Sequence, residues 1–203
     1  MNLEIKISKK LIPYESAFKF LKRRVDTLKK QKGKDLLWIL EHPLSFTGGI
    51  RSKKNEILDK NIKIIKTNRG GKITLHNPGQ KIIYFVLNLN NKKKDIRNLI
   101  KQIEVSIIEF LKIYKIKSYA DKKNIGIWVK GKKIAAIGVR VSQWIAYHGC
   151  SININNNLEH YKKIIPCGLD NNSITSIKNE NIKKINNVNY NLRKIFIKNL
   201  KNV

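Results

Sequence analysis

Apolar residues recur every three or four positions in three segments, residues 13–30, 95–114 and 188–200. This spacing places the apolar side chains on one face of a helix and therefore predicts three amphipathic helices. Pro13 stands where a first helical turn tolerates proline. Asp95 is suited to cap the second helix or to occupy its first turn.

Short alternating or continuous apolar runs predict strands at residues 1–7, 35–40, 60–66, 81–89, 126–129, 133–141 and 144–155, with one more inside 69–80. Pro43 and the glycines after it indicate a loop over 41–49. Residues 158–164 are expected to be a short helical or looped segment, and 173–176 to cap a small helix. Strands and helices alternate irregularly, which favours an α/β or α+β fold: one domain over residues 1–203, with a mixed sheet flanked by helices.

A chain of 203 residues can bury a core without disulfides. No apolar run approaches 18 residues, so no membrane-spanning helix is expected. The first seven residues alternate and lack the apolar core of a signal peptide, which favours a cytoplasmic protein with free thiols at Cys150 and Cys167. The four histidines show no close pair of the kind that metal sites use, so no metal is expected.

The formal net charge of +29 comes from 43 Lys and Arg against 14 Asp and Glu. Lys, Ile and Asn are abundant together, as expected from a drift toward A/T-rich codons. The lysines are spread along the chain rather than clustered with aromatic residues, so nucleic-acid binding is not expected as the main function. The charge is either a solvated basic surface or a means of steering an acidic protein partner.

The glycines gather where chemistry is expected. Of 11 glycines, all except Gly33 fall in the blocks 48–49, 70–79 and 126–168. Glycine permits turns and close backbone approach that other residues resist, so these blocks are candidate ligand-binding segments.

Cys167 lies in a turn between Pro166 and Gly168, a setting more typical of a nucleophile than of a core cysteine. A nucleophilic thiol needs a group that lowers its pKa, and Lys133 is a candidate. Lys133 leads an apolar strand, so it is either a rim residue or a partly buried amine. Lys132 should point to the opposite face, because side chains alternate along a strand.

Four other residues carry weaker signals. Cys150, just before a strand segment, is expected to be a small core or pocket-wall residue. His76 and His148 stand at glycine-rich strand ends, where they are placed to hydrogen-bond a substrate or orient a loop. His160 lies in a polar stretch and is expected at the surface.

Five blocks together resemble the lipoyl(octanoyl) transferases: L-W-I-L-E-H-P (37–43), R-G-G-K-I-T-L-H-N-P-G-Q (69–80), G-I-W-V-K-G-K-K-I-A-A-I-G-V-R (126–140), Y-H-G-C-S-I-N-I-N (147–155) and I-P-C-G-L (165–169). The resemblance implies a fold similar to the lipoate and biotin protein ligases. It implies transfer of an octanoyl group from octanoyl-acyl carrier protein to a lysine of a lipoyl domain, with no cofactor. The acceptors so implied are lipoyl domains of 2-oxoacid dehydrogenase complexes and the glycine cleavage H protein, and a monomer is expected.

The same resemblance assigns catalysis to Cys167, as the residue that carries the acyl thioester, and to Lys133. It implies substrate binding by Arg69, Gly70, Gly71, Lys72, Ile73, Thr74, Leu75, His76, Ala136, Ile137, Gly138, Gly149, Cys150 and Ser151. Three positions depart from the family pattern: Asn77 replaces a usual glycine, Gly49-Ile50 replaces a Gly-Arg pair, and Cys150 takes a place that is more often apolar. Two alternatives remain, an ATP-dependent lipoate or biotin ligase and a non-enzymatic basic binding domain.

Overall fold

The structure is a computed structural model that describes residues 2–166, 173–182 and 184–203. Its strands are β1 (Leu3–Ile7), β2 (Asp35–Leu40), β3 (Ser45–Gly48), β4 (Ile64–Lys66), β5 (Ile73–His76), β6 (Gln80–Asn88), β7 (Tyr119–Ala120), β8 (Gly126–Val129), β9 (Lys132–Ser142) and β10 (Ile145–Asn153). Its helices are α1 (Tyr14–Lys29), α2 (Ile96–Ile113) and α3 (Val188–Leu200), with short 3₁₀ turns η1 (Lys54–Glu56), η2 (Leu89–Asn91), η3 (Glu159–Lys163) and η6 (Lys178–Glu180).

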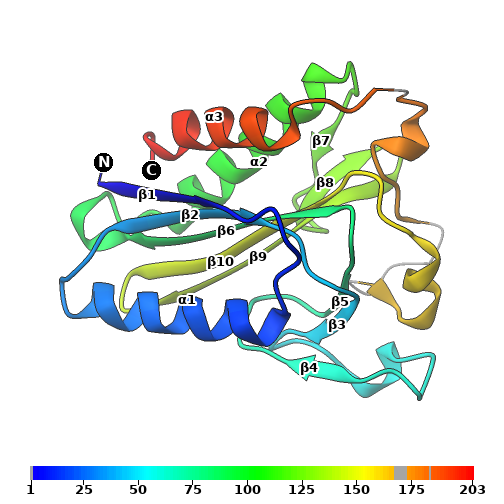
Figure 1. Ribbon diagram of the computed structural model, residues 1–203, viewed down its shortest axis with the longest axis horizontal. Coiled ribbons are helices and arrows are strands. Elements are labelled where there is room, and N and C mark those ends of the chain that lie inside the picture. The colour runs from blue at the N-terminus through cyan, green and yellow to red at the C-terminus, as the bar shows by residue number, and fades with distance from the viewer. Residues whose placement is uncertain (1, 167–172, 183) are drawn as a thin grey trace.

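Seven strands form the main sheet in the order β1-β2-β6-β10-β9-β8-β7. Only its β1–β2 pair is parallel, so the sheet is mixed, as the sequence predicts. A second sheet of three strands, β4-β3-β5, lies beside the start of α1, on the face of the main sheet that α1 covers (Figure 1).

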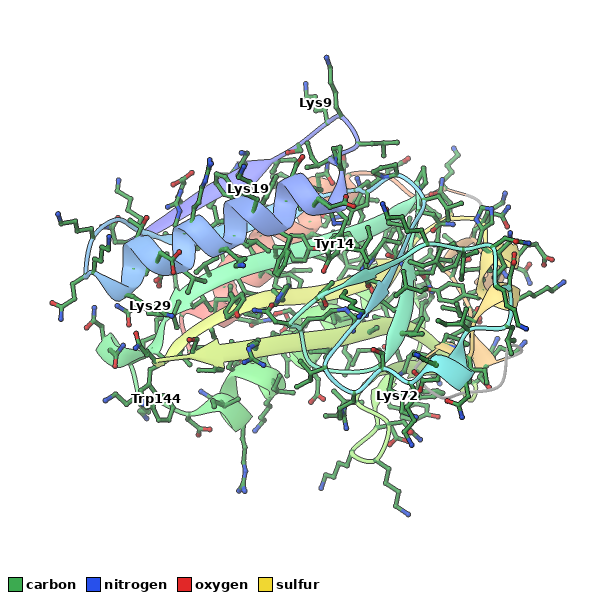
Figure 2. All side chains as sticks on the ribbon, turned by 90° about the horizontal axis from the view of Figure 1, so that it is seen from below. Lys9, Tyr14, Lys19, Lys29, Lys72 and Trp144 are labelled. Carbon is green, nitrogen blue, oxygen red and sulfur yellow. The ribbon has the colours of Figure 1, made fainter. Side chains whose placement is uncertain are left out.

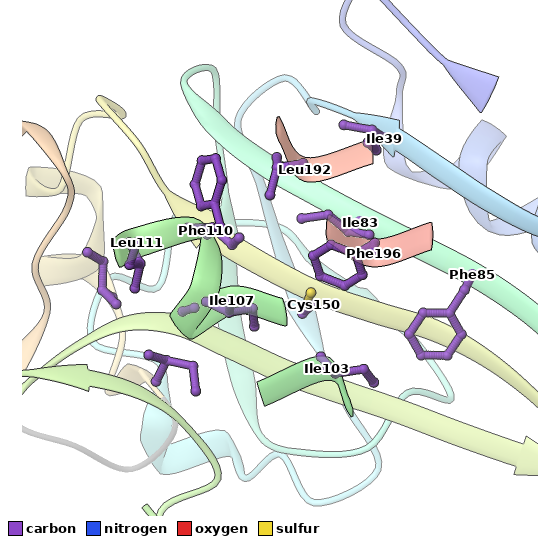
Figure 3. Close-up of a cluster of buried hydrophobic side chains, with 14 of the residues drawn as sticks. Ile39, Ile83, Phe85, Ile103, Ile107, Phe110, Leu111, Cys150, Leu192 and Phe196 are labelled. Carbon is purple, nitrogen blue, oxygen red and sulfur yellow. The ribbon is translucent and has the colours of Figure 1, made fainter. Parts of the chain in front are cut away.

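The alternation of side chains along the central strands explains the layers. One set, with Trp38 of β2 and Tyr84 of β6, packs under Leu21 of α1. The other set, with Ile39 and Ile83, packs against α2 and α3 on the opposite face (Figures 1 and 3). Each face of the sheet therefore has its own apolar core, and only the α1 face also carries the small sheet.

The three helices and most strands begin and end within a few residues of their predicted positions. The short helix expected after 173–176 is present as η6, with Ile177 at its N-cap, and Ser176 Oγ accepts a hydrogen bond from Asn179 N at 3.2 Å. In the described part of the chain, no helix is both long and apolar enough to cross a bilayer.

Three strand predictions differ from the structure. The segment predicted as a loop over 41–49 contains β3, the strand at 60–66 shortens to β4, and the two-residue β7 was not predicted. β3 holds only four residues, too few for a sequence pattern. It is ordered by pairing with β5 on one side and β4 on the other.

Candidate active site

A pocket opens on the α1 face between the loop that precedes β5 and the adjoining strands β9 and β10. Most of the residues expected to bind substrate line it: Arg69, Gly70, Gly71, Lys72, Thr74, His76, Ala136, Ile137, Gly138, Gly149, Cys150 and Ser151. Segments separated by about 80 positions in the sequence thus meet at one site.

Two of the expected residues lie elsewhere. Ile73 and Leu75 point to the other side of β5, where they are buried with Phe46 and Tyr161 in the core of the small sheet. Strand alternation requires this, because Thr74 and His76 face the pocket. Sequence reasoning missed Ile82 and Tyr84, which complete the wall from β6. It identified His148 only as a strand-end residue suited to contact a ligand.

Arg69 holds in place the loop that precedes β5 and borders the pocket. Its side chain is buried, and its guanidinium donates to Thr47 O at 2.8 Å, to Thr47 Oγ1 at 3.0 Å and to Gly70 O at 3.0 Å. Gly70 in turn lies against β9, where a Cβ would stand 2.9 Å from Val139 O. The side chain of Arg69 is therefore an anchor for the loop.

Behind the pocket, aromatic and histidine rings fill the space under the start of α1. Tyr14 stacks on His76 with centroids 5.6 Å apart, and His42 meets His76 edge-on at 5.5 Å (Figure 2 labels Tyr14). His42 Nε2 lies 2.9 Å from Tyr84 Oη, and His76 Nδ1 lies 2.8 Å from Gln80 Oε1. These ring contacts and hydrogen bonds make the wall of the pocket under α1 densely packed.

These histidines are neutral at physiological pH. Burial lowers the pKa of His42 to about 4. Burial, with the nearby charges of Arg69 and Arg140, lowers the pKa of His148 to about 3. Burial also holds the pKa of His76 well below its usual value. Neutral rings suit a pocket that receives an apolar group.

His148 breaks the alternation of β10. Its φ of 69° lies in the left-handed region, which is uncommon for a residue other than glycine. Ala146 and Cys150, two positions away on either side, face the α2 and α3 core, yet the His148 ring packs with Phe18, Tyr84 and Tyr147 on the α1 face. The backbone twist therefore turns the imidazole into the pocket.

Among the described residues, Lys133 is the one buried lysine, with 5% of its surface exposed. Its neighbour Lys132 is exposed. A β-bulge sets the direction of the Lys133 side chain. Lys133 pairs with Trp128 and Ala135 pairs with Ile127, so Ile134 is an extra residue on β9. Ile137 and Val139 contact the α2 and α3 core, so strict alternation would point Lys133 there too. The bulge reverses its face, a known use of bulges beside functional sites.

The Lys133 amine is held by the β7–β8 connection. Nζ donates to Ile125 O at 3.1 Å and lies 5.1 Å from the centroid of the Trp128 ring. Gly126 leaves room for it, since a Cβ there would stand 2.9 Å from Lys133 Cε and 3.3 Å from Nζ. The amine is thus fixed without a carboxylate partner within salt-bridge distance in the described part of the chain.

Lys133 lines a second, smaller pocket that adjoins the first. Thr74, Ala136 and Ser151 line both pockets, so the two lie side by side. Pro166 and Ile174 also line the smaller pocket. Cys167, the expected nucleophile, lies outside the described residues; it follows Pro166 directly in the sequence.

Cys150 is a free thiol. Its sulfur lies between Ile83, Ile107 and Phe196, in the core under α2 and α3 (Figure 3). Burial raises the pKa of the Cys150 thiol far above its usual value. Cys150 is therefore inert as a nucleophile, although it borders the pocket, and it is the small core residue that the sequence predicts.

Two backbone N–H groups of the turn after β5 already have hydrogen-bond acceptors. Gly79 N donates to Glu41 Oε2 at 2.7 Å, and Gln80 N donates to Asn77 O at 3.1 Å. These two N–H groups are engaged, so they are not available to an oxyanion. Asn77 has an ordinary φ and donates to Asn157 O at 2.7 Å, so it fits the turn without glycine.

Comparison with known families gives a match over residues 13–192 to the family described as "Lipoyl protein ligase A/B catalytic domain". A curated relative named "Octanoyltransferase" from Wolbachia sp. subsp. Brugia malayi (strain TRS) is 40% identical over 201 residues, covering 95% of this chain and 97% of the relative. Another of that name, from Ehrlichia chaffeensis (strain ATCC CRL-10679 / Arkansas), is 41% identical over 182 residues, covering 87% of this chain and 85% of the relative.

Solved structures share the fold at low identity. Lipoate-protein ligase A bound with ATP superposes with a TM-score of 0.77 at 13% identity, covering 98% of this chain and 86% of that protein. A putative lipoate protein ligase from T. acidophilum with bound lipoic acid gives 0.69 at 14% identity, covering 83% of this chain and 74% of that protein. These two likenesses establish the fold alone.

Proposed function

This chain belongs to the octanoyltransferases of the lipoyl protein ligase A/B catalytic family, and from that premise we propose how it transfers the octanoyl group. Cys167 takes the acyl group from octanoyl-acyl carrier protein as a thioester. Lys133 lowers the pKa of the thiol, donates a proton to the departing carrier thiolate and accepts one from the acceptor amine. The ε-amine of a lysine on a lipoyl domain then receives the acyl group.

The observation that carries the proposal is the setting of Lys133. Its buried amine faces a pocket whose wall includes Pro166, the residue directly before Cys167, and Ile174, on the far side of the same stretch. Thr175 N also donates to Lys133 O at 3.0 Å. Both described flanks of Cys167 are therefore tied to Lys133, which supports a thiol within reach of the amine.

In the first step, the Cys167 thiolate attacks the carbonyl carbon of the donor thioester. An adjacent ammonium favours the thiolate over the thiol. The bond from the carbonyl carbon to the carrier's sulfur breaks, and the departing thiolate takes a proton from the Lys133 ammonium. One thioester replaces another, so this step is nearly balanced and needs no nucleotide.

In the second step, the acceptor lysine attacks the Cys167 thioester. The now neutral Lys133 amine accepts the proton that the acceptor nitrogen releases, and the C–S bond breaks as the amide forms. Cys167 returns as a thiolate beside an ammonium. Backbone N–H groups near Gly168 and in the turn 77–80 are the candidates for stabilising the oxyanion. Because Gly79 N and Gln80 N are engaged, the Gly168 N–H is the proposed donor.

The larger pocket is proposed to hold the hydrocarbon chain. Burying seven methylene and methyl groups at about 0.8 kcal/mol each stabilises the bound chain by roughly 5–6 kcal/mol before ordering costs. Ala136, Gly138 and Gly149 line this pocket, and their small or absent side chains leave space for the acyl chain beside the strands.

Intact-protein mass spectrometry after incubation with octanoyl-acyl carrier protein tests the mechanism. The unmodified sequence should gain one octanoyl group, Cys167→Ala should gain none, and Lys133→Ala should gain it much more slowly. Cys150→Ala is the matched control, because it removes the other cysteine and should still become acylated. Mass gain that persists in Cys167→Ala overturns the mechanism.

An ATP-dependent ligase is the competing reaction, since a solved ligase of this fold is bound with ATP. Such an enzyme would charge free octanoate with ATP and would not need Cys167. Relatives near 40% identity favour the transferase. Supplying octanoate and ATP without a carrier protein should therefore give no modified lipoyl domain.

The proposed acceptors are the lipoyl domains of 2-oxoacid dehydrogenase complexes and the glycine cleavage H protein, served by a monomer. Modification of each purified acceptor, followed by mass, tests the first statement. Light scattering on the purified protein tests the second.

A further inference from the structure

We propose that the ring of His148 is the end wall of the acyl pocket and sets the length of chain that this enzyme accepts. The inference rests on the proposed function, because it assumes that the acyl chain enters from the Lys133 end. It assigns His148 as a specificity-determining residue.

His148 lies between the acyl pocket and the side chains that line a second cavity. The acyl pocket includes Gly138, Gly149 and His148. The second, a surface pocket of about 240 Å³, is lined by Asn68 and Tyr147, which both contact the His148 ring. Removal of the ring would extend the acyl pocket toward Asn68 and Tyr147.

Neighbouring side chains hold the ring in this position. His148 Nε2 lies 2.8 Å from Asn68 Oδ1, and Asn68 Nδ2 donates to Tyr147 Oη at 2.7 Å. The imidazole also stacks between Phe18, at 5.6 Å, and Tyr147, at 4.8 Å. Together with the left-handed φ of 69°, these contacts make a fixed partition.

The length of β9 between the Lys133 pocket and His148 is compatible with an octanoyl chain. Ala135 lines the Lys133 pocket, and Val139 pairs with His148 four residues further along β9. Four strand residues span roughly 13 Å. Seven zigzag C–C bonds of about 1.5 Å span roughly 9 Å, which leaves the remainder for the cysteine side chain and the thioester. A dodecanoyl chain is about 5 Å longer and would collide with the ring.

The two histidines that face the pocket differ in what lies behind them. Behind His76, Tyr14 stacks on the ring and His42 packs against its edge. Behind His148 lie Asn68 and Tyr147, which line the surface pocket. A longer chain can therefore be admitted at His148 and not at His76.

The test compares octanoyl, decanoyl, dodecanoyl and tetradecanoyl donors on acyl carrier protein, measured as kcat/KM for transfer to a lipoyl domain. His148→Gly removes the ring and suits the left-handed backbone, and His148→Asn keeps a residue that tolerates this conformation. His148→Phe refills the space. His160→Asn, a matched change outside these pockets, is the control.

We expect His148→Gly to raise the dodecanoyl-to-octanoyl ratio of kcat/KM about tenfold or more, His148→Asn to raise it less, and His148→Phe and His160→Asn to leave it unchanged. A folded His148→Gly or His148→Asn protein with the original ratio overturns the inference. If neither folds, Asn68→Ser releases the ring without altering β10 and must raise the ratio. If the unmodified protein does not transfer octanoyl, the result contradicts the proposed function instead.

Discussion

Lys133 shows how single residues prepare this site. Its amine is buried, yet it is held by a carbonyl and an aromatic face, with Gly126 making room beside it. Gly126 has a φ of +148°, and any Cβ there would press on Lys133 Cε and approach Ala135 O at 2.6 Å. The position of one amine thus depends on a residue without a side chain.

Gly126→Ala should therefore slow acylation of Cys167 about 10²-fold by displacing the Lys133 amine. It should also lower the free energy of unfolding by about 1–3 kcal/mol through backbone strain. Trapping rates followed by mass, together with urea denaturation, measure the two effects.

Gly131→Ala is the matched control. Gly131 also has a positive φ, of 76°, but a Cβ there would meet nothing within 4 Å. It should lose about 1–2 kcal/mol of stability and keep its acylation rate. Equal rates in the two alanine variants would show that Gly126 does not position the amine.

At the scale of elements, a chain of amides ties β10 to the segment after Cys167. Asn153, at the end of β10, accepts from Gln80 Nε2 at 2.9 Å and donates to Thr175 O at 3.0 Å. Thr175 N donates to Lys133 O at 3.0 Å. The network therefore joins the turn after β5, the end of β10 and the strand that carries Lys133.

Asn153→Ala should cost about 2–4 kcal/mol of stability, because buried partners on both sides lose a hydrogen bond. It should also slow acylation, since the segment beyond Cys167 loses an anchor. Asn199→Ala removes another buried asparagine, which bonds Ser106 and Glu109 on α2, away from the pocket. If both variants lose stability and neither loses rate, the network serves the fold alone.

The histidines packed between α1 and the sheet give stability a pH dependence. His42 and His148 have folded pKa values of about 4 and about 3, against 6.5 as the ordinary value. The unfolded chain therefore binds protons below pH 6.5 that the folded chain does not. Their contribution is fully present above pH 6.5 and is lost as the pH falls toward 4.

We expect the free energy of unfolding to fall by roughly 1.4 kcal/mol per pH unit for each of these histidines between pH 6 and 4.5. Urea titrations at several pH values measure the slope. His42→Asn should reduce that slope by one histidine's share. A stability that does not change between pH 7 and 5 would contradict the neutral state of these rings.

For the whole molecule, the formal net charge is +29, and exposed basic residues lie both near the pocket and far from it. Arg51 is exposed on the loop beside the pocket, where its backbone N–H donates to Gly71 O at 3.0 Å. Lys29 is exposed at the opposite end of the molecule from Lys72 (Figure 2). Equal changes of charge can thus be made near to the pocket and far from it.

Arg51→Glu should lower kcat/KM for an acidic carrier protein several-fold at low salt, with kcat unchanged, because it weakens electrostatic steering at the mouth. The loss should shrink as salt is added. Lys29→Glu carries the same change in net charge and should have a much smaller effect. Similar losses in both variants would mean that only total charge matters, as expected from codon drift.

The helices, most strands and the participating segments of the site could be predicted because each is encoded locally. Apolar spacing determined α1, α2 and α3, and the glycine-rich blocks marked the segments that line the pocket. The resemblance to the octanoyltransferases depended on the same local blocks. Helical periodicity and backbone freedom at glycine are properties of a few neighbouring residues, so the sequence by itself carries them.

The directions in which the Lys133 and His148 side chains point were decided only by the tertiary structure. The bulge at Ile134 turns Lys133 into the cavity, and the left-handed backbone at His148 turns its ring across the pocket's end. Alternation along the chain predicts the opposite face for both. Each reversal is held by contacts from other segments: Trp128 and Ile125 in and before the neighbouring strand β8 for the lysine, and the distant Asn68 and Phe18 for the histidine. A local pattern cannot contain such contacts, because they exist only once the strands have paired and packed.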